Sequence, residues 1–181
     1  MRYYREIRTK TGRACILRSP AAKDAEKILA HMRLTSGETD YMLRYPDEIT
    51  LPVKDERALL ERIAASSNEV MIAAEIDGKL VANAGFSPVL PCEKARHRAE
   101  FGISVQRAYW GEGIGSAILE GILDSARRAG YRQMELDVVS DNERGVALYR
   151  KFGFRAYGTL EHACLLRDGS WQTLYRMACR L

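Results

Sequence analysis

The sequence predicts an α/β fold (α+β in the stricter sense), with one mixed, mostly antiparallel central sheet flanked by helices. Strand-like segments joined by turn residues fill much of the first half of the chain, and a strand–helix–strand–helix order follows in the second. The chain has 181 residues, and they contain no internal repeat, low-complexity tract or linker. We therefore expect residues 1–181 to form one domain.

Composition narrows the classes of function. Lys and Arg exceed Asp and Glu by 28 to 24, a net charge of +4 that suits an anionic ligand but is too small to indicate nucleic acid. The cysteines lie far apart and form no CxxC pair, so we expect no disulfide framework and no metal site. The first residues are charged where a signal peptide is apolar, and no segment has the length of a membrane span. We expect a cytoplasmic protein without a membrane partner.

Period-two patterns and turn residues predict four strands in the first half of the chain: residues 3–8, 14–18, 70–76 and 80–86. Asp77-Gly78 between the last two is a strong hairpin signal. Ser19, as N-cap, and Pro20, at the first helical position, are expected to open a helix. The polar segment 36–50 is expected to be a loop or a short helix, and a second helix is expected around residues 58–64.

The second half of the chain is expected to alternate between strands and helices, ending in a hairpin around Asp168-Gly169. The expected strands are residues 98–105, 133–139, 154–166 and 171–179. The expected helices are residues 113–129 and 142–152.

Three alternating glycines lie between the strand that ends at Val105 and the next helix. Glycine lets the backbone approach a ligand closely, and the first N–H groups of a helix have no partner inside it. This turn therefore predicts a phosphate site. The residues expected to form it are Gly111, Glu112, Gly113, Ile114, Gly115 and Ser116.

The glycine turn has alternative interpretations. It could be a tight turn without a ligand. A P-loop is excluded, because Gly115 is followed by Ser-Ala instead of Lys-Ser or Lys-Thr. A dinucleotide site is closer, since Gly111-x-Gly113-x-x-Ser116 resembles GxGxxG; however, five residues separate the glycines from the strand, whereas that fold turns directly off its strand.

The turn resembles the acetyl-CoA signature of the GCN5-related N-acetyltransferase (GNAT) family, Arg/Gln-x-x-Gly-x-Gly/Ala. Its glycines match, but Trp110 stands where the family has a cation, and Arg107 is a candidate substitute. The segment NERGVALYRKFGF, from Asn142 to Phe154, resembles the family's Asn-x-x-Ala-x-x-Leu-Tyr-x-x-x-Gly-Phe block. The resemblance covers residues 96–158 and is nearest to the ribosomal-protein alanine acetyltransferase branch.

This resemblance implies a GNAT-like fold and an N-acetyltransferase that moves an acetyl group from acetyl-CoA to a primary amine by direct attack. The amine could belong to a small molecule or to a protein N-terminus, and a homodimer remains open. The alternatives are a non-catalytic acyl-CoA-binding module and a dinucleotide-dependent oxidoreductase. By resemblance, backbone groups of Ile103 and Val105 are expected to bind the pantetheine arm where neighbouring strands diverge.

Acyl transfer to an amine needs a base, because an alkylammonium with a pKa near ~10.4 is neutral about once in 10³ molecules at pH 7. Glu100 is the candidate. It shares one strand face with the small residues Gly102 and Ser104, which leave room for a ligand. Family members often use a glutamate on this strand through ordered water. The alternative is that Glu100 only pairs with Arg98.

The family block supplies two further candidates. Tyr149 matches a tyrosine that lies close to the CoA sulfur and can donate a proton to the leaving thiolate, although it could equally be a core residue. Asn142 matches an asparagine that hydrogen-bonds the pantetheine arm in family members, and it also lies where it can cap its helix. On the acceptor side, the acidic segment 36–50 could attract a cationic amine or be a solvated loop. Tyr41, Tyr45 and Trp171 could wall the pocket or only pack.

Overall fold

The computed structural model describes residues 1–181, and its eight strands form a single sheet in the order β1-β2-β3-β4-β5-β6-β8-β7. All neighbouring strands are antiparallel except β5 and β6, which are parallel. The strands are β1 (Tyr4–Arg8), β2 (Ala14–Arg18), β3 (Val70–Ile76), β4 (Lys79–Pro88), β5 (Arg98–Val105), β6 (Gln133–Val139), β7 (Arg155–Leu165) and β8 (Trp171–Arg180). The mixed, mostly antiparallel sheet is therefore confirmed.

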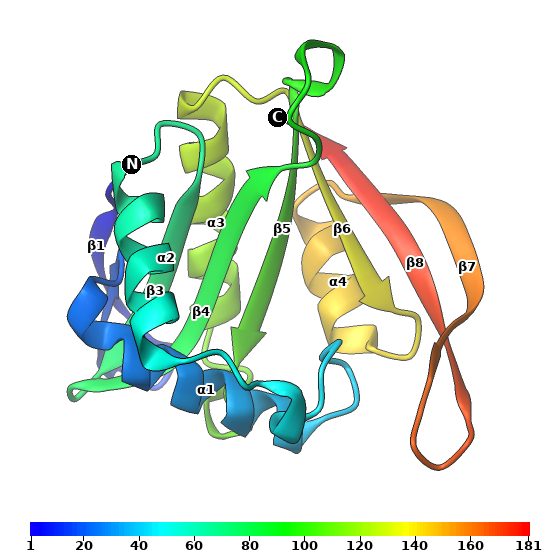
Figure 1. The fold of residues 1–181 in the computed structure, drawn as a ribbon, viewed down its shortest axis with the longest axis horizontal. Helices are drawn as coiled ribbons and strands as arrows, with labels where there is room; N and C mark the ends of the chain where they lie inside the picture. Colours follow the sequence, from blue (N-terminus) through cyan, green and yellow to red (C-terminus); the bar gives the residue numbers. More distant parts are fainter.

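Helices cover both faces of this sheet (Figure 1). α1 (Ala25–Glu38) and α2 (Val53–Ala65) lie on one face, and α3 (Ile114–Arg128) and α4 (Glu143–Lys151) lie on the other. The main core lies between the sheet and α3, where Ile118 and Ile122 are fully buried. No helix combines the length and the apolar character that crossing a membrane requires.

The predicted hairpin around Asp77-Gly78 is confirmed. Both residues adopt positive φ angles, 50° and 75°, which is the conformation that a two-residue type I′ turn requires and that Gly and Asp tolerate. The hairpin carries β3 into β4, and β4 in turn pairs with β5 along its length, from Ala82–Val105 to Pro88–Ala99. Local turn chemistry thus places β5 in the middle of the sheet.

The predicted start of the first helix is wrong. Ser19 does not cap it; its Oγ instead accepts a hydrogen bond from the backbone N–H of Tyr3, 3.0 Å away. The chain enters α1 through a short 3-10 turn, η1 (Ala22–Asp24), where the Asp24 carboxylate accepts from the N–H of Ala21 at 2.8 Å. α1 also extends to Glu38, into the segment expected to be a loop or a short helix, and a short 3-10 helix, η2 (Pro46–Glu48), follows there.

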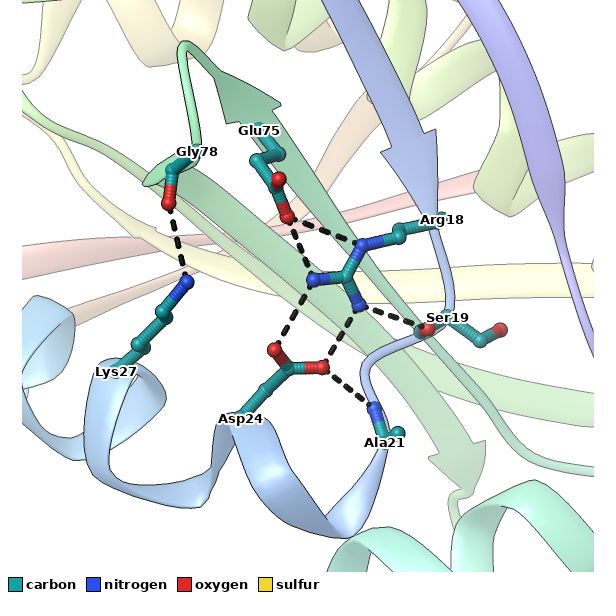
Figure 2. Close-up of polar contacts among 7 residues, drawn as sticks. All are labelled: Arg18, Ser19, Ala21, Asp24, Lys27, Glu75 and Gly78. Carbon is teal, nitrogen blue, oxygen red and sulfur yellow. Dashed lines mark hydrogen bonds and ion pairs between the residues drawn. The ribbon is translucent and has the colours of Figure 1, made fainter.

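An ion-pair cluster fixes η1 to the sheet. The Arg18 guanidinium lies between two carboxylates, 2.7 Å from an oxygen of Asp24 and 2.6 Å from an oxygen of Glu75 (Figure 2). Asp24 is 2% exposed. The neighbouring Arg18 holds the pKa of that carboxyl below its usual range. The cluster therefore joins β2, β3 and the entry to α1.

The two parallel strands separate in the middle of the sheet. β5 and β6 pair only from Arg98–Gln133 to Glu100–Glu135, although β5 continues to Val105. Figure 1 shows them together at the top of the view and diverging toward the bottom. The divergence that the family resemblance implied is therefore present. It leaves the β6-facing edge of β5 without a strand partner at residues 101–105, where the Val105 carbonyl oxygen accepts instead from Nε1 of Trp110.

Candidate active site

A cavity of about 270 Å³ opens where β5 and β6 diverge. Its lining includes every residue predicted for cofactor binding except Glu112, and it also includes Tyr149. These lining residues are Ile103, Val105, Gly111, Gly113, Ile114, Gly115, Ser116, Asn142 and Tyr149. The first cavity, as we call it, therefore joins the two motifs found in the sequence, one at the start of α3 and one at the start of α4.

The glycine turn presents the N-terminus of α3 to this cavity. Gly111 and Gly113 have φ angles of 82° and 90°, in the left-handed region that disfavours residues with a side chain. Gly113 is the N-cap of α3, and no side chain caps the helix. The first N–H groups of the helix, at residues 114–116, are therefore available to an anion, and the helix dipole favours negative charge there.

Glu112 differs from its neighbours in this turn. Its side chain is outside the lining and forms an ion pair with Arg13 and a hydrogen bond with Thr11, whose Oγ1 donates to Oε2 at 2.9 Å. The backbone N–H of Lys10 also donates to the carbonyl oxygen of Glu112, 2.9 Å away. The carboxylate of Glu112 thus holds the turn between β1 and β2 against the glycine turn and does not face the ligand.

Trp110, at the position where the family has a cation, packs against the guanidinium groups of two arginines. Its ring centroid lies 5.6 Å from Cζ of Arg107 and 5.1 Å from Cζ of Arg144. Arg107 does not line the cavity, and its guanidinium Nη2 donates to the backbone carbonyl oxygen of Glu38. The expected substitute cation is therefore bound elsewhere.

The cations that line the first cavity are Lys10 and Arg144. Arg144 comes from the first turn of α4, and Lys10 comes from the turn that Glu112 holds in place. Neither was predicted from the sequence. Arg144 lies inside the second motif but at a variable position of it, and Lys10 lies far from both motifs.

Asn142 serves as the cap that the sequence predicted. Its Oδ1 accepts a hydrogen bond from the backbone N–H of Gly145 at 3.0 Å. A side chain at Gly145 would be impossible without a shift, because a Cβ there would lie 2.7 Å from Nδ2 of Asn142. Capping uses only the oxygen, so the Nδ2 amide group of Asn142 keeps its hydrogens for a ligand in the cavity.

Tyr149 lies at the inner end of the first cavity and is 8% exposed. Its ring packs edge-on against Phe101, with centroids 5.7 Å apart. Burial raises the pKa of Tyr149 to about 12. The phenol is therefore protonated throughout the physiological range. Its position is consistent with both expected roles, as a core residue and as a proton donor.

A second cavity, of about 560 Å³, adjoins the first. The residues that line both are Tyr41, Met42, Ile103, Ser104, Asn142 and Tyr149. The lining of the second cavity includes Met32 and Asn83 from the sheet face that carries α1 and α2, and Phe101 and Tyr149 from the face that carries α4. Gly102 also lines it, and a Cβ at Gly102 would meet nothing within 4 Å. The space that small residues on β5 were expected to leave is therefore present.

Glu100 is exposed on the same strand face, two residues before Gly102, but it does not line either cavity. It is opposite Ser87, which does line the second cavity. The alternative role, pairing with Arg98, is not observed, because Arg98 binds Glu135 instead, with Nη2 and Oε2 2.8 Å apart. Glu100 is thus free of ion pairs at the edge of the second cavity.

The segment after α1 meets both cavities through Tyr41 and Met42. Two of its carboxylates are engaged with the protein: Asp47 lies 2.7 Å from Nη2 of Arg167, and Glu48 accepts a hydrogen bond from the backbone N–H of Tyr45 at 2.8 Å. Tyr45 lies under the same guanidinium, with the Arg167 Cζ 4.0 Å from its ring centroid. Trp171 is 54% exposed and outside both cavities. Of the three aromatic residues considered for the pocket, only Tyr41 lines it.

Comparison with known families identifies the same part of the chain. The model of the acetyltransferase (GNAT) family matches residues 34–154, which include both motifs and most of the residues that line the two cavities. Among curated proteins, the chain is similar to an L-methionine sulfoximine/L-methionine sulfone acetyltransferase of Pseudomonas aeruginosa. The two are 23% identical over 165 residues, which cover 91% of this chain and 94% of the relative.

A second relative, the N-alpha-acetyltransferase RimI of Mycobacterium tuberculosis, is 36% identical over 104 residues, or 56% of this chain and 61% of the relative. Among solved structures, a putative acetyltransferase from Salmonella typhimurium, determined with acetyl-CoA, has a TM-score of 0.81 and 21% identity. That match covers 92% of this chain and 94% of the other. At this identity the structural likeness supports the fold.

Proposed function

The chain belongs to the acetyltransferase (GNAT) family, and we propose that its two cavities hold the two substrates of an acetyl transfer. It is an N-acetyltransferase that uses acetyl-CoA as its acetyl donor and an amine as its acceptor. The similarity to an N-alpha-acetyltransferase agrees with the branch that the sequence resembles. An oxidoreductase using a dinucleotide is thereby excluded.

The observation that carries the proposal is the junction of the cavities at Tyr149. Tyr149 lines both cavities, and the first cavity is also lined by the glycine turn. In the proposed complex, the N–H groups at residues 114–116 bind the diphosphate of acetyl-CoA, with Lys10 and Arg144 adding positive charge. The free edge of β5 at Ile103 and Val105 and the Nδ2 group of Asn142 bind the pantetheine arm.

In the proposed reaction, the acceptor amine attacks the thioester carbonyl directly. The N–C bond forms as the C–S bond breaks; Glu100 takes the amine proton through water, and Tyr149 gives its proton to the leaving thiolate. The cysteines give little support to an acyl-enzyme. Burial raises the pKa of Cys15 and of Cys179 to about 11, so neither is a thiolate near pH 7.

A primary amine on a compact, partly apolar molecule is the proposed acceptor. The second cavity has apolar walls from Met32, Met42 and Phe86, and polar groups at Asn83 and Ser87. Relatives that acetylate methionine sulfone or other L-amino acids make amino acids the first compounds to test. Peptides that begin with alanine and the polyamine spermidine test the protein N-terminus and a longer cationic acceptor.

The test measures release of CoA thiol from acetyl-CoA with a panel of L-methionine sulfone, L-leucine, an alanine-initiated peptide and spermidine. We expect release with at least one amine and none without amine. Tight binding of acetyl-CoA with no release for any amine would instead indicate a non-catalytic acyl-CoA-binding module. Thermal stabilisation by acetyl-CoA, approaching ~2.7 kcal/mol at 100 times its Kd, measures binding independently of turnover.

We place residues 1–181 in one catalytic domain, since the strands, helices and turns that line both cavities all belong to or pack on a single sheet. Its cysteines are all unpaired, which fits a reducing compartment such as the cytoplasm. A homodimer would be detected by the mass of the protein in solution.

A further inference from the structure

A chain of hydrogen bonds runs between α1 and the sheet and ends where the two cavities meet. Nδ1 of His31 lies 3.2 Å from Nε2 of Gln106, and Nε2 of His31 lies 2.8 Å from Oγ of Ser104. Ser104 Oγ lies 2.7 Å from Oδ1 of Asn83. His31 is 2% exposed and Ser104 is 8% exposed, so these bonds are shielded from water.

One fixed contact sets the direction of these hydrogen bonds. Nε2 of Gln106 donates to the carbonyl oxygen of Leu80 at 2.8 Å, which identifies it as the amide nitrogen because a carbonyl can only accept. Its second hydrogen points to Nδ1 of His31, so the ring hydrogen is on Nε2. His31 therefore donates to Ser104, and Ser104 donates its hydroxyl hydrogen to Asn83.

This arrangement determines what Ser104 can offer a ligand. A hydroxyl group has one hydrogen and two acceptor lone pairs. Asn83 takes the hydrogen and His31 takes one lone pair, so a single lone pair remains. Ser104 lines both cavities together with Tyr149. The junction thus holds an acceptor that suits a ligand with an N–H donor.

His31 is not itself a base in this arrangement. Burial lowers the pKa of His31 to about 4, so the ring is neutral near pH 7. Its Nδ1 accepts from Gln106 and its Nε2 donates to Ser104, and both nitrogens are therefore in use. The ring can hold the Ser104 hydroxyl in one orientation without exchanging a proton.

We propose that Oγ of Ser104 accepts a hydrogen bond from an N–H of the acceptor amine, and that His31 is a positioning residue that orients Ser104 for this contact. The inference rests on the proposed function, because it takes the second cavity to be the acceptor site. Ser104 neither gains nor loses a proton. The proton released as the N–C bond forms goes toward Glu100, and the thiolate receives one from Tyr149.

This role makes Ser104 a determinant of acceptor class. A neutral primary amine has two N–H hydrogens, so one can be held by Ser104 while the nitrogen lone pair attacks and the other proton leaves. An alcohol or a thiol has a single hydrogen, which must leave during attack. Such an acceptor gives Ser104 nothing to bind, and the site therefore favours amines.

The first test compares Ser104→Ala with Ser125→Ala, a control at a serine that is 3% exposed on α3 and outside both cavities. With the best amine of the panel, we expect Ser104→Ala to lower kcat/KM about tenfold, the usual effect of one hydrogen bond, mainly through a higher KM for the amine. The Kd of acetyl-CoA should change less than about twofold. Equal kcat/KM values in the two variants would overturn the assignment of Ser104.

The second test separates a positioning role from a basic one. His31→Gln keeps an N–H donor near the place of ring Nε2, whereas His31→Leu removes it. We expect the His31→Gln variant to retain more activity than the His31→Leu variant, with the parent's pH–rate profile unchanged. Equal activities in these variants would overturn the positioning role, and a shifted profile in His31→Gln would show that His31 acts as a base.

Nitrogen-15 NMR of the parent's imidazoles provides a readout that does not depend on turnover. We expect His31 to be neutral, with its hydrogen on Nε2, at pH 6; a protonated ring or the Nδ1–H tautomer would contradict the proposal. The outcomes separate the two proposals. A parent that acetylates no amine counts against the function, whereas an active parent with an equally active Ser104→Ala variant counts against Ser104 alone.

Discussion

The indole Nε1 of Trp110 donates a hydrogen bond to the carbonyl oxygen of Val105, 2.7 Å away, and so joins the end of β5 to the glycine turn. The same ring supports Arg144, whose Cζ lies 5.1 Å from its centroid. Where family members place a cation in the turn itself, this chain places a tryptophan that fixes the turn and supports a cation from α4. The first cavity therefore still contains a cation, which comes from α4 instead of from the turn.

Trp110→Ala should therefore weaken acetyl-CoA binding about tenfold, since it removes both the hydrogen bond to Val105 and the support of Arg144. Trp110→Phe keeps a ring but not the N–H and should give an intermediate Kd in calorimetric titrations. If the Ala and Phe variants both bind as the parent does, Trp110 has no part in the site.

Arg144→Ala should raise the Kd of acetyl-CoA about tenfold and make it less dependent on salt, because a charge-assisted contact to phosphate is lost. The matched control is Arg150→Ala, an exposed arginine of the same helix that does not line the cavity. Titrations at two salt concentrations check both effects. Equal losses in the two variants would mean that only general positive charge matters.

Tyr149→Phe should lower kcat about 10²-fold while leaving the Kd of acetyl-CoA within about twofold, as expected for the loss of a proton donor. Because the pKa of Tyr149 is raised to about 12, the parent's rate should show no alkaline decline from this group below about pH 10. A Phe variant with the parent's kcat would make Tyr149 a packing residue.

Glu100→Gln should lower kcat/KM for the amine and change the pH–rate profile, since an amide cannot take a proton. Glu61→Gln, at an exposed position of α2, is the control and should leave the profile unchanged. Steady-state rates from pH 5 to 9 provide the comparison. A Glu100→Gln variant whose profile matches the parent's would place the base elsewhere.

The buried carboxyl group of Glu56 should make the free energy of unfolding depend on pH, independently of catalysis. Glu56 is 2% exposed, and its Oε1 has no hydrogen-bond partner. Burial raises the pKa of Glu56 in the folded state above its ordinary value of 4.5. Folded protein therefore keeps this proton at pH values above 4.5 at which unfolded protein has lost it. The free energy of unfolding consequently falls as the pH rises through this range. Near pH 7 the buried charge is destabilising.

Glu56→Met should therefore raise the free energy of unfolding by about 1 kcal/mol at pH 7, and by less at pH 5, where the parent's carboxyl is more nearly neutral. Urea denaturation at the two pH values measures this difference. A variant that is less stable than the parent at pH 7 would show that the carboxylate has a favourable role in α2.

Local sequence patterns were sufficient to predict the strands, turns and helix starts that carry the two motifs. β5 and β6 have the predicted bounds, and the hairpin at Asp77-Gly78 and the cap at Asn142 follow from rules that involve a few neighbouring residues. Each of the two motifs lies at the start of a helix, and both helices face the gap beside β5. The first cavity therefore brings together nearly every residue predicted to bind the cofactor.

Contacts between distant segments were not predictable from these patterns. Lys10 reaches the site only because the turn before β2 is tied to Glu112, and His31 meets Ser104 across 73 positions of the sequence. Ser19 is of a residue type that often caps helices, but its hydroxyl accepts from the N–H of Tyr3, and the Asp24 carboxylate binds the N–H of Ala21 at the start of the 3-10 turn. Such choices depend on tertiary packing.

A crystal structure of the protein with acetyl-CoA tests the central claim most directly. We predict diphosphate oxygens at hydrogen-bonding distance, about 2.7–3.2 Å, from backbone nitrogens at residues 114–116, with the thioester sulfur beside the Tyr149 hydroxyl. Density for the coenzyme along another surface, with no phosphate at the start of α3, would contradict the account.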